Sequence, residues 1–181
     1  SEKKTAFPTI QQICSSIRKK YEYHSEKEVY EILVPNGIED ILAEGECLKH
    51  CIDVNNLYLQ RIADRETYIL FLRKRENPMQ PYFTLEVEPN GTVRQKSTYY
   101  NRQEKNMDEI NQFLKRWQRV IQKRLSKQDK LWTEESQRKR EEEYLQLRKE
   151  KKIIFAGNYN GRLLADILEE NLLEAEAEPA A

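Results

Sequence analysis

Residues 81–99, PYFTLEVEPNGTVRQKSTY, contain the pattern that decides the fold of this chain. Apolar side chains alternate with Tyr82, Thr84 and Glu86, which is the two-residue period of a strand with one buried face. The tripeptide at 89–91, Pro-Asn-Gly, is a strong turn signal. We therefore predict a β-hairpin. Its first strand places the side chains of Phe83, Leu85 and Val87 on one face.

Two earlier segments extend this hairpin into a larger sheet. TYILFLRK (67–74) is rich in β-branched and aromatic residues, and EVYEILVP (28–35) alternates before a second Pro-Asn-Gly turn at 35–37. Because the predicted strands are joined by short connections, we expect an antiparallel β-meander of about three to four strands.

Three segments, 9–23, 38–52 and 107–125, have apolar residues at the spacing of an α-helix. The third has a broad apolar face of the kind that covers the apolar face of a sheet. We therefore predict an α+β fold in which helices cover the antiparallel meander, and a compact domain that spans residues 1–125.

The composition changes after residue 125. Residues 126–152 are mostly charged with sparse apolar positions, so we expect a long exposed helix that packs against little. The stretch 153–162 interrupts this helix, and a short amphipathic helix and an acidic tail follow. Residues 126–181 therefore form a predicted charged helical extension.

The overall charge is balanced, with 31 Lys and Arg against 31 Asp and Glu in 181 residues, so net charge predicts no partner. The distribution is uneven, because the basic segment Lys115–Lys130 has seven basic residues and only Asp129 as an acid, whereas the stretch from Ile153 onward has six acids and only Arg162 as a base. Two interpretations stay open, namely two solvated helix faces, or a polyanion-binding stripe that the tail could screen.

The location is also constrained by the sequence. No apolar run approaches the ~20 residues that span a bilayer, and the first ten residues lack an apolar signal-peptide core. Three cysteines without a disulfide-framework spacing fit a reducing cytosol. We expect a cytoplasmic protein without membrane insertion, and the sequence leaves open whether a further domain precedes Ser1.

The stretch GECLKHC (45–51) places Cys47, His50 and Cys51 close together. If a helix continues through residue 51, these three side chains share one face and suit zinc or another thiophilic metal. A fourth ligand would have to be His24 or Cys14, and the usual paired Cys/His signature is missing. We therefore predict no metal or other cofactor as the main interpretation.

Two other interpretations of this stretch stay open. Cys51 could be a thiolate nucleophile with His50 as its base, although adjacent side chains on a helix diverge. Cys51 could equally be a small buried side chain in a packing helix. The residues available to complete a catalytic pocket around His50 and Cys51 are Thr84, Glu86, Gln95 and Asn101.

Several ordered blocks in residues 28–125 resemble the C-terminal domain of the PcfJ-like proteins. These blocks are EGECLKHCIDVNNLYLQRIADRETYILFLRK, PYFTLEVEPNGTVRQKSTYYNR and FLKRWQRVIQKRL. The positions that match the family pattern are Leu48, His50, Cys51, Tyr58, Thr84, Glu86, Gln95 and Asn101. Three positions depart from it, because Lys49 replaces a frequent His, Asp53 a frequent Gly, and Cys47 a small residue without a thiol, and the departures weaken the metal interpretation.

The PcfJ-like proteins are encoded on conjugative plasmids and integrative elements of Gram-positive bacteria. The resemblance therefore implies an accessory or adaptor protein of DNA transfer in the bacterial cytoplasm. Its implied partners are DNA, the relaxosome proteins and the coupling ATPase. The alternative is an enzyme of unknown substrate that uses the pocket around His50 and Cys51.

The basic segment offers phosphate contacts for the DNA-binding role, with Trp117 and Trp132 as candidates for base stacking. No helix-turn-helix or zinc-finger signature accompanies it. The predicted nucleic-acid-binding residues are Lys115, Arg116, Arg119, Lys123, Arg124 and Lys127.

Overall fold

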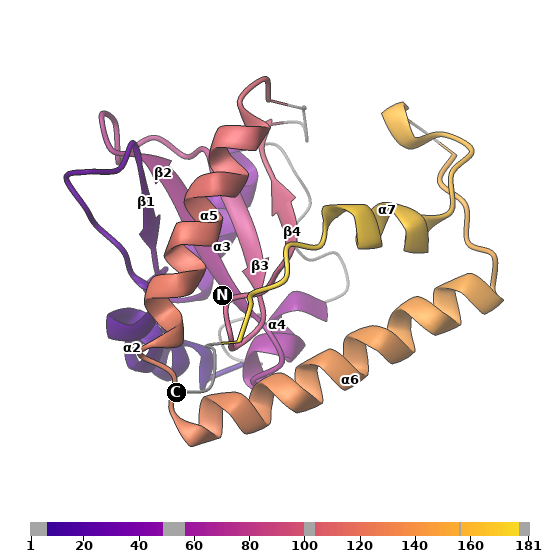
Figure 1. The fold of residues 1–181 in the computed structure, drawn as a ribbon, viewed down its shortest axis with the longest axis horizontal. Coiled ribbons are helices and arrows are strands. Elements are labelled where there is room, and N and C mark those ends of the chain that lie inside the picture. The colour runs from indigo at the N-terminus through magenta and orange to yellow at the C-terminus, as the bar shows by residue number, and fades with distance from the viewer. Residues whose placement is uncertain (1–6, 49–56, 100–103, 156, 178–181) are drawn as a thin grey trace.

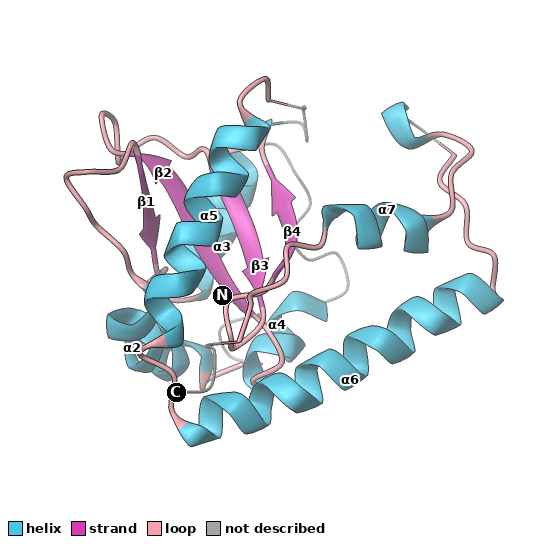
Figure 2. Ribbon diagram, viewed as in Figure 1, coloured by secondary structure: helices cyan, strands magenta, loops and turns pink. Residues whose placement is uncertain are grey.

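A computed structural model describes residues 7–48, 57–99, 104–155 and 157–177 of the chain. Three strands follow one another in the middle of the chain, and most of the other elements are helices (Figures 1 and 2). In chain order, the elements are α2 (Ile10–Tyr21), β1 (Tyr30–Leu33), α3 (Ile38–Cys47), α4 (Leu57–Ala63), β2 (Tyr68–Lys74), β3 (Phe83–Val87), β4 (Val93–Ser97), α5 (Met107–Gln122), α6 (Lys127–Lys149), the 3₁₀ turn η2 (Gly157–Tyr159) and α7 (Leu164–Asn171).

The four strands form one antiparallel sheet in the order β1-β2-β3-β4. Each strand therefore pairs with its neighbour in sequence, and the predicted α+β fold with an antiparallel meander is confirmed. The turn between β3 and β4 is closed by a hydrogen bond of 2.8 Å from the Gly91 N–H to the Glu88 carbonyl. Gly91 has φ of 93°, a left-handed conformation that glycine adopts without steric cost.

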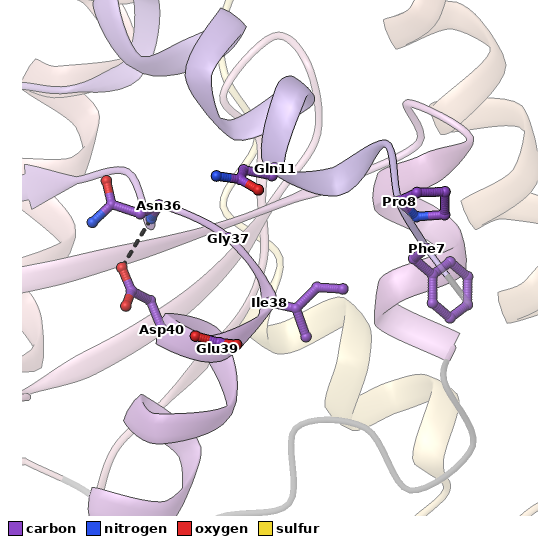
Figure 3. Close-up of a pocket in the computed structure, with 8 residues that line it drawn as sticks. All are labelled: Phe7, Pro8, Gln11, Asn36, Gly37, Ile38, Glu39 and Asp40. Atoms are coloured by element: carbon purple, nitrogen blue, oxygen red, sulfur yellow. Dashed lines mark hydrogen bonds between the residues drawn. The ribbon is translucent and has the colours of Figure 1, made fainter. Parts of the chain in front are cut away.

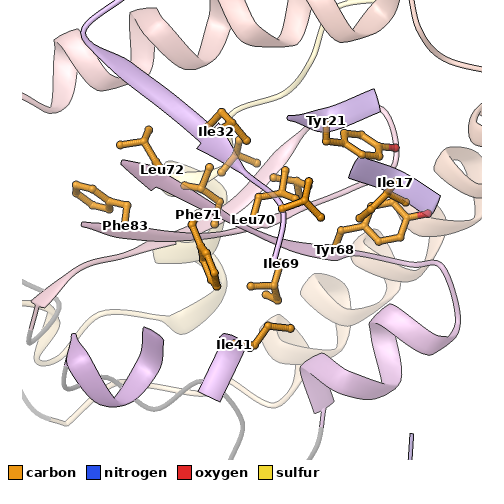
Figure 4. Packing of buried hydrophobic residues seen from close by; sticks show 14 of the residues in the cluster. Ile17, Tyr21, Ile32, Ile41, Tyr68, Ile69, Leu70, Phe71, Leu72 and Phe83 are labelled. Atoms are coloured by element: carbon orange, nitrogen blue, oxygen red, sulfur yellow. The ribbon is translucent and has the colours of Figure 1, made fainter. Parts of the chain in front are cut away.

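Helix α5 lies across one face of the sheet and α3 lies on the other (Figure 1). The buried face of α5 contains Phe113 and Trp117, and the Trp117 indole N–H donates to the Tyr21 carbonyl at 2.9 Å, which joins α5 to the end of α2. On β2, Leu70 and Leu72 point to one side while Ile69 points toward Ile41 of α3 (Figure 4). The sheet is therefore buried on both faces, as the apolar residues of β2 require.

Helix α3 is shorter than the sequence pattern predicts. The pattern predicts a helix through residue 52, but α3 ends at Cys47 with Leu48 as its cap. Of Cys47, His50 and Cys51, the described helix therefore contains Cys47 alone. His50 and Cys51 lie outside the described residues.

Helix α6 is less exposed than its composition suggests. It is helical over 23 residues, as predicted, and it begins with a capping box between Ser126 and Asp129. One stripe along it is buried, however, at a spacing of three or four residues. This stripe consists of Asp129, Thr133, Ser136, Arg140 and Tyr144. The expectation that the helix packs against little was wrong, because a stripe dominated by polar side chains resembles a solvated face.

Both edges of the sheet are bridged by single residues from other parts of the chain. Tyr23 pairs with Ile32 on β1 through two hydrogen bonds of 3.0 Å, and Leu173 pairs with Val93 on β4 through two of 2.9 Å. The segment after α7 therefore returns to the sheet. No helix in the described part of the chain is both long and apolar enough to cross a membrane.

Candidate functional site

The predicted polar pocket can be followed for three of its residues. Glu86 on β3 lies directly opposite Gln95 on β4, so their side chains share one face of the sheet, and Thr84 lies two residues along β3 on that same face. Thr84 and Glu86 are buried and Gln95 is half-buried. His50, Cys51 and Asn101 lie outside the described residues.

Helix α4 places two more polar side chains against these residues. The Tyr58 hydroxyl donates to Oε1 of Gln95 at 3.4 Å, and the Arg61 guanidinium carbon lies 5.6 Å from the centre of the Tyr58 ring. Arg61 donates through Nη1 to both carboxylate oxygens of Glu86, at 3.0 and 3.3 Å. Gln95, Tyr58, Arg61 and Glu86 therefore form one continuous polar cluster, here called the α4 cluster.

Glu86 already has several hydrogen-bond partners in this arrangement. Besides Arg61, the Thr67 hydroxyl donates to Oε2 of Glu86 at 2.7 Å. A buried carboxylate that accepts from a guanidinium and a hydroxyl is compensated for its loss of hydration. Glu86 therefore holds α4 against the sheet through Arg61.

A second ion-pair group lies beside the α4 cluster and is centred on Arg94. Arg94 donates from Nε to Glu88 at 2.7 Å and from Nη1 to Glu66 at 2.8 Å, and its Nη2 reaches the carbonyl of Ser136 on α6 at 2.9 Å. Burial alone would lower the pKa of Arg94, but the surrounding carboxylates raise it, so the guanidinium stays charged. The group therefore links β3, β4 and α6 through buried charges.

Helix α6 also contributes charged side chains of its own. Arg140 donates to both oxygens of Glu88, at 3.0 and 3.1 Å, and Glu143 accepts from Nη2 of Arg61 at 3.1 and 3.2 Å. Burial raises the pKa of Glu88, and the two arginines oppose that rise. Because α6 is attached through hydrogen-bonded ion pairs, its position depends on the geometry of these pairs more than on the burial of apolar side chains.

These arginines were missed in the sequence because each lies in an otherwise ordinary polar stretch. Tyr58 and Arg61 are three residues apart and therefore share one helix face, but only the tertiary fold brings Glu86 opposite them. The inward stripe of α6 gave no sequence signal either, because its mostly polar residues resemble a solvated helix face.

The soft metal ligands are dispersed in the described structure. Cys14 is buried in α2, and burial raises the pKa of its thiol to about 11. Cys47 is exposed at the end of α3. His24 is exposed, and hydrogen bonds to Glu22 and Glu31 raise its pKa despite partial burial, which alone would lower it. Within the described residues, no group of three His, Cys, Asp or Glu side chains could hold a metal ion.

The basic segment divides into two groups of side chains. Three of its side chains have partners, since Lys115 donates to the Glu174 carbonyl at 2.5 Å, Arg116 pairs with Glu28 at 2.9 Å, and Arg124 donates to main-chain carbonyls of residues 19, 20 and 22 at 3.2–3.4 Å. The other four are exposed and form no ion pair with any described residue. They are Arg119, Lys123, Lys127 and Lys130.

The aromatic residues suggested for stacking are not available in this arrangement. Trp117 is 0% exposed, because it lies in the core beneath α5. Trp132 is half-buried, and the Arg65 guanidinium carbon lies 4.7 Å from the centre of its ring. The basic segment therefore presents charge without stacking partners from these two residues.

A separate pocket of about 260 Å³ lies at the start of α3, and its lining does not include Thr84, Glu86 or Gln95 (Figure 3). At its rim, the Asn36 N–H donates to Oδ2 of Asp40 at 2.9 Å. The two nearby acids, Glu39 and Asp40, make it unsuited to an anion. Its lining residues are Phe7, Pro8, Gln11, Asn36, Gly37, Ile38, Glu39 and Asp40.

Comparison with known proteins gives a family and one curated relative. A model of the family described as PcfJ-like protein matches residues 9–114, more than half of the chain. The relative is an uncharacterized protein of Listeria innocua, Lin1253/Lin1744, which is 33% identical over 66 residues. These residues are 36% of this chain and span 14% of that relative's length. No solved structure matches the chain.

Proposed function

Because this chain belongs to the PcfJ-like protein family, we propose that it is an accessory protein of a mobile genetic element that acts in conjugative DNA transfer. In this role the protein contacts DNA in the cytoplasm of a bacterium. It also contacts the relaxosome proteins and the coupling ATPase, either through the DNA or directly. The family match is the observation that carries the proposal.

The proposed DNA contact is made by the exposed cations of the basic segment. Arg119, Lys123 and Lys127 are free of ion pairs with the described residues, so their charge is available to a phosphate backbone. The family match ends at residue 114, just before this segment. Support for the DNA contact therefore comes from charge and exposure, whereas support for the mobile-element role comes from the family.

The DNA contact is tested by fluorescence anisotropy with a labelled duplex at several salt concentrations. The double variant Lys123→Glu/Lys127→Glu removes two proposed phosphate contacts, so we expect roughly tenfold weaker binding and a salt slope smaller by about 2. The matched control is Lys149→Glu/Lys152→Glu, which changes net charge equally at the other end of α6 and at the residues just beyond it.

The outcomes separate clearly. Loss of affinity in the first variant alone supports the proposed contact. Equal losses in both variants would mean that net charge, rather than the basic segment, governs binding. Absence of binding by the unmodified protein at low salt would rule out the DNA contact and leave the protein partners as the proposed targets.

A further inference from the structure

Helix α2 meets the end of α5 and the beginning of α6 at one corner of the molecule (Figure 1). Arg124 donates to the carbonyls of Lys19 and Lys20 at 3.4 and 3.2 Å, which joins the end of α5 to the last turn of α2. Lys20 is in turn paired with Asp129 in the first turn of α6. Two basic segments that are more than 100 residues apart in sequence therefore become one surface.

The cations at this corner fall into an attached set and an available set. The attached set joins the three helices: Arg124 hydrogen-bonds to main-chain carbonyls of α2, and Lys20 pairs with Asp129 of α6. The remaining cations are exposed and have no ion pair among the described residues, and we call them the basic corner. They are Lys19, Arg119, Lys123, Lys127 and Lys130.

The exposed face of α2 continues this surface with neutral hydrogen-bonding groups. Gln12, Ser15 and Lys19 are spaced by three and four residues, so they follow one line along the helix, and all three are exposed. The helix has no acidic residue between Ile10 and Tyr21. Amide, hydroxyl and ammonium groups are the side chains that contact phosphate and sugar oxygens in protein–DNA complexes.

We propose that the basic corner and the exposed face of α2 together bind the phosphate backbone of double-stranded nucleic acid, an inference that rests on the proposed DNA contact. The duplex is favoured over a single strand for two reasons. Trp117 is buried and Trp132 is packed beneath Arg65, so neither supplies the stacking platform that single-strand binders use. A duplex also has the higher charge density, and a surface of separate cations responds to charge density.

The test measures binding of a 20-base-pair duplex and of either of its strands alone, in the full chain, by anisotropy at low salt. We expect the duplex to bind at least several-fold more tightly than the strand. Lys19→Glu should weaken duplex binding by about fivefold and reduce the salt slope by about 1. Lys149→Glu is the matched control, because Lys149 lies at the other end of α6, about 30 Å along the helix from Asp129 at the corner.

Several results would overturn the inference. Tighter binding of the single strand would assign this surface to stacking instead of duplex backbone. An unchanged affinity in Lys19→Glu, together with a loss in Lys123→Glu/Lys127→Glu, would exclude α2 while leaving the proposed DNA contact intact. No binding by the unmodified protein would remove both proposals, and circular dichroism of each variant establishes that the helices are retained.

Discussion

Gly91 is constrained both by its left-handed backbone conformation and by the close approach of the Ile121 side chain. Its φ of 93° disfavours any side chain, and a Cβ at this position would meet Cδ1 of Ile121 and lie 3.3 Å from its Cγ1. We expect Gly91→Ala to lower the free energy of unfolding by about 2–4 kcal/mol, from strain and overpacking together. Gly161 has φ of 84° and open space around it, so Gly161→Ala should cost only about 1–2 kcal/mol. Urea unfolding measures both.

The same clash can be relieved from the other side. Ile121→Val removes Cδ1, so Gly91→Ala should cost less in that background than in the unmodified chain. Equal costs for Gly91→Ala and Gly161→Ala would show that α5 moves aside readily and that the close packing of this turn is not important for stability.

Cys14 predicts a dependence of stability on pH. Burial raises the pKa of its thiol to about 11 from an ordinary value of 9.0, so the folded state keeps a proton that the unfolded state loses. This contribution is fully present below pH 9 and is lost as pH rises toward 11, by up to about 2–3 kcal/mol. Cys14→Ala should therefore lose less stability than the unmodified protein between pH 8 and 10.5 in urea unfolding. Parallel pH profiles would contradict the assigned cause.

Helix α4 is held by Arg61, and this attachment can be compared with a surface ion pair on α6. Arg61→Ala leaves Glu86 buried without its guanidinium partner, so we expect a loss of about 3–5 kcal/mol in unfolding free energy. Arg138 pairs with Glu135 and Glu142 on the exposed face of α6, and Arg138→Ala should change stability little. A loss for Arg61→Ala no larger than that for Arg138→Ala would show that water replaces Arg61 at Glu86.

The elements differ in how well their sequences predict them. The strands were predicted to within two residues at each end, because alternation and Pro-Asn-Gly turns are local features, and the pairing of Glu86 with Gln95 follows from that hairpin. The burial of α6 could not be predicted from its composition, since its inward stripe consists mainly of polar residues that pair with Glu88 and Arg94 only in the folded chain.

The candidate site also divides into features that local sequence predicts and features that only the folded chain creates. Alternation along the strand correctly placed Thr84 and Glu86 on one sheet face, and the structure adds Gln95 to that face. The contacts of Glu86 with Arg61 and of Gln95 with Tyr58 depend on a distant helix. The pocket around His50 and Cys51 stays a prediction, as do the division of the chain at residue 125 and the DNA contacts.

The two tryptophans allow the unfolding of the whole molecule to be followed in two places. Trp117 reports on the core beneath α5 and Trp132 reports on α6. Arg140 on α6 forms a buried ion pair with Glu88, and Arg94 on β4 hydrogen-bonds to Ser136 on α6. Because these buried contacts join α6 to the sheet, we expect both regions to unfold in one transition. Trp132→Phe and Trp117→Phe each leave one fluorophore, and their urea midpoints, corrected by far-UV circular dichroism for each variant's own stability, should coincide. An earlier transition at Trp132 would mean that α6 detaches before the sheet unfolds.

The bridge between Leu173 and Val93 has a consequence for synthesis on the ribosome. Ala175, two residues further along, hydrogen-bonds to Thr92, a residue 83 positions earlier. At roughly 5–20 residues per second, the closing segment is made roughly 4–17 seconds after the strand that it protects. During that interval the outer edge of β4 is an open template for pairing with other nascent chains, so aggregation in the cell should depend on translation speed between these two segments.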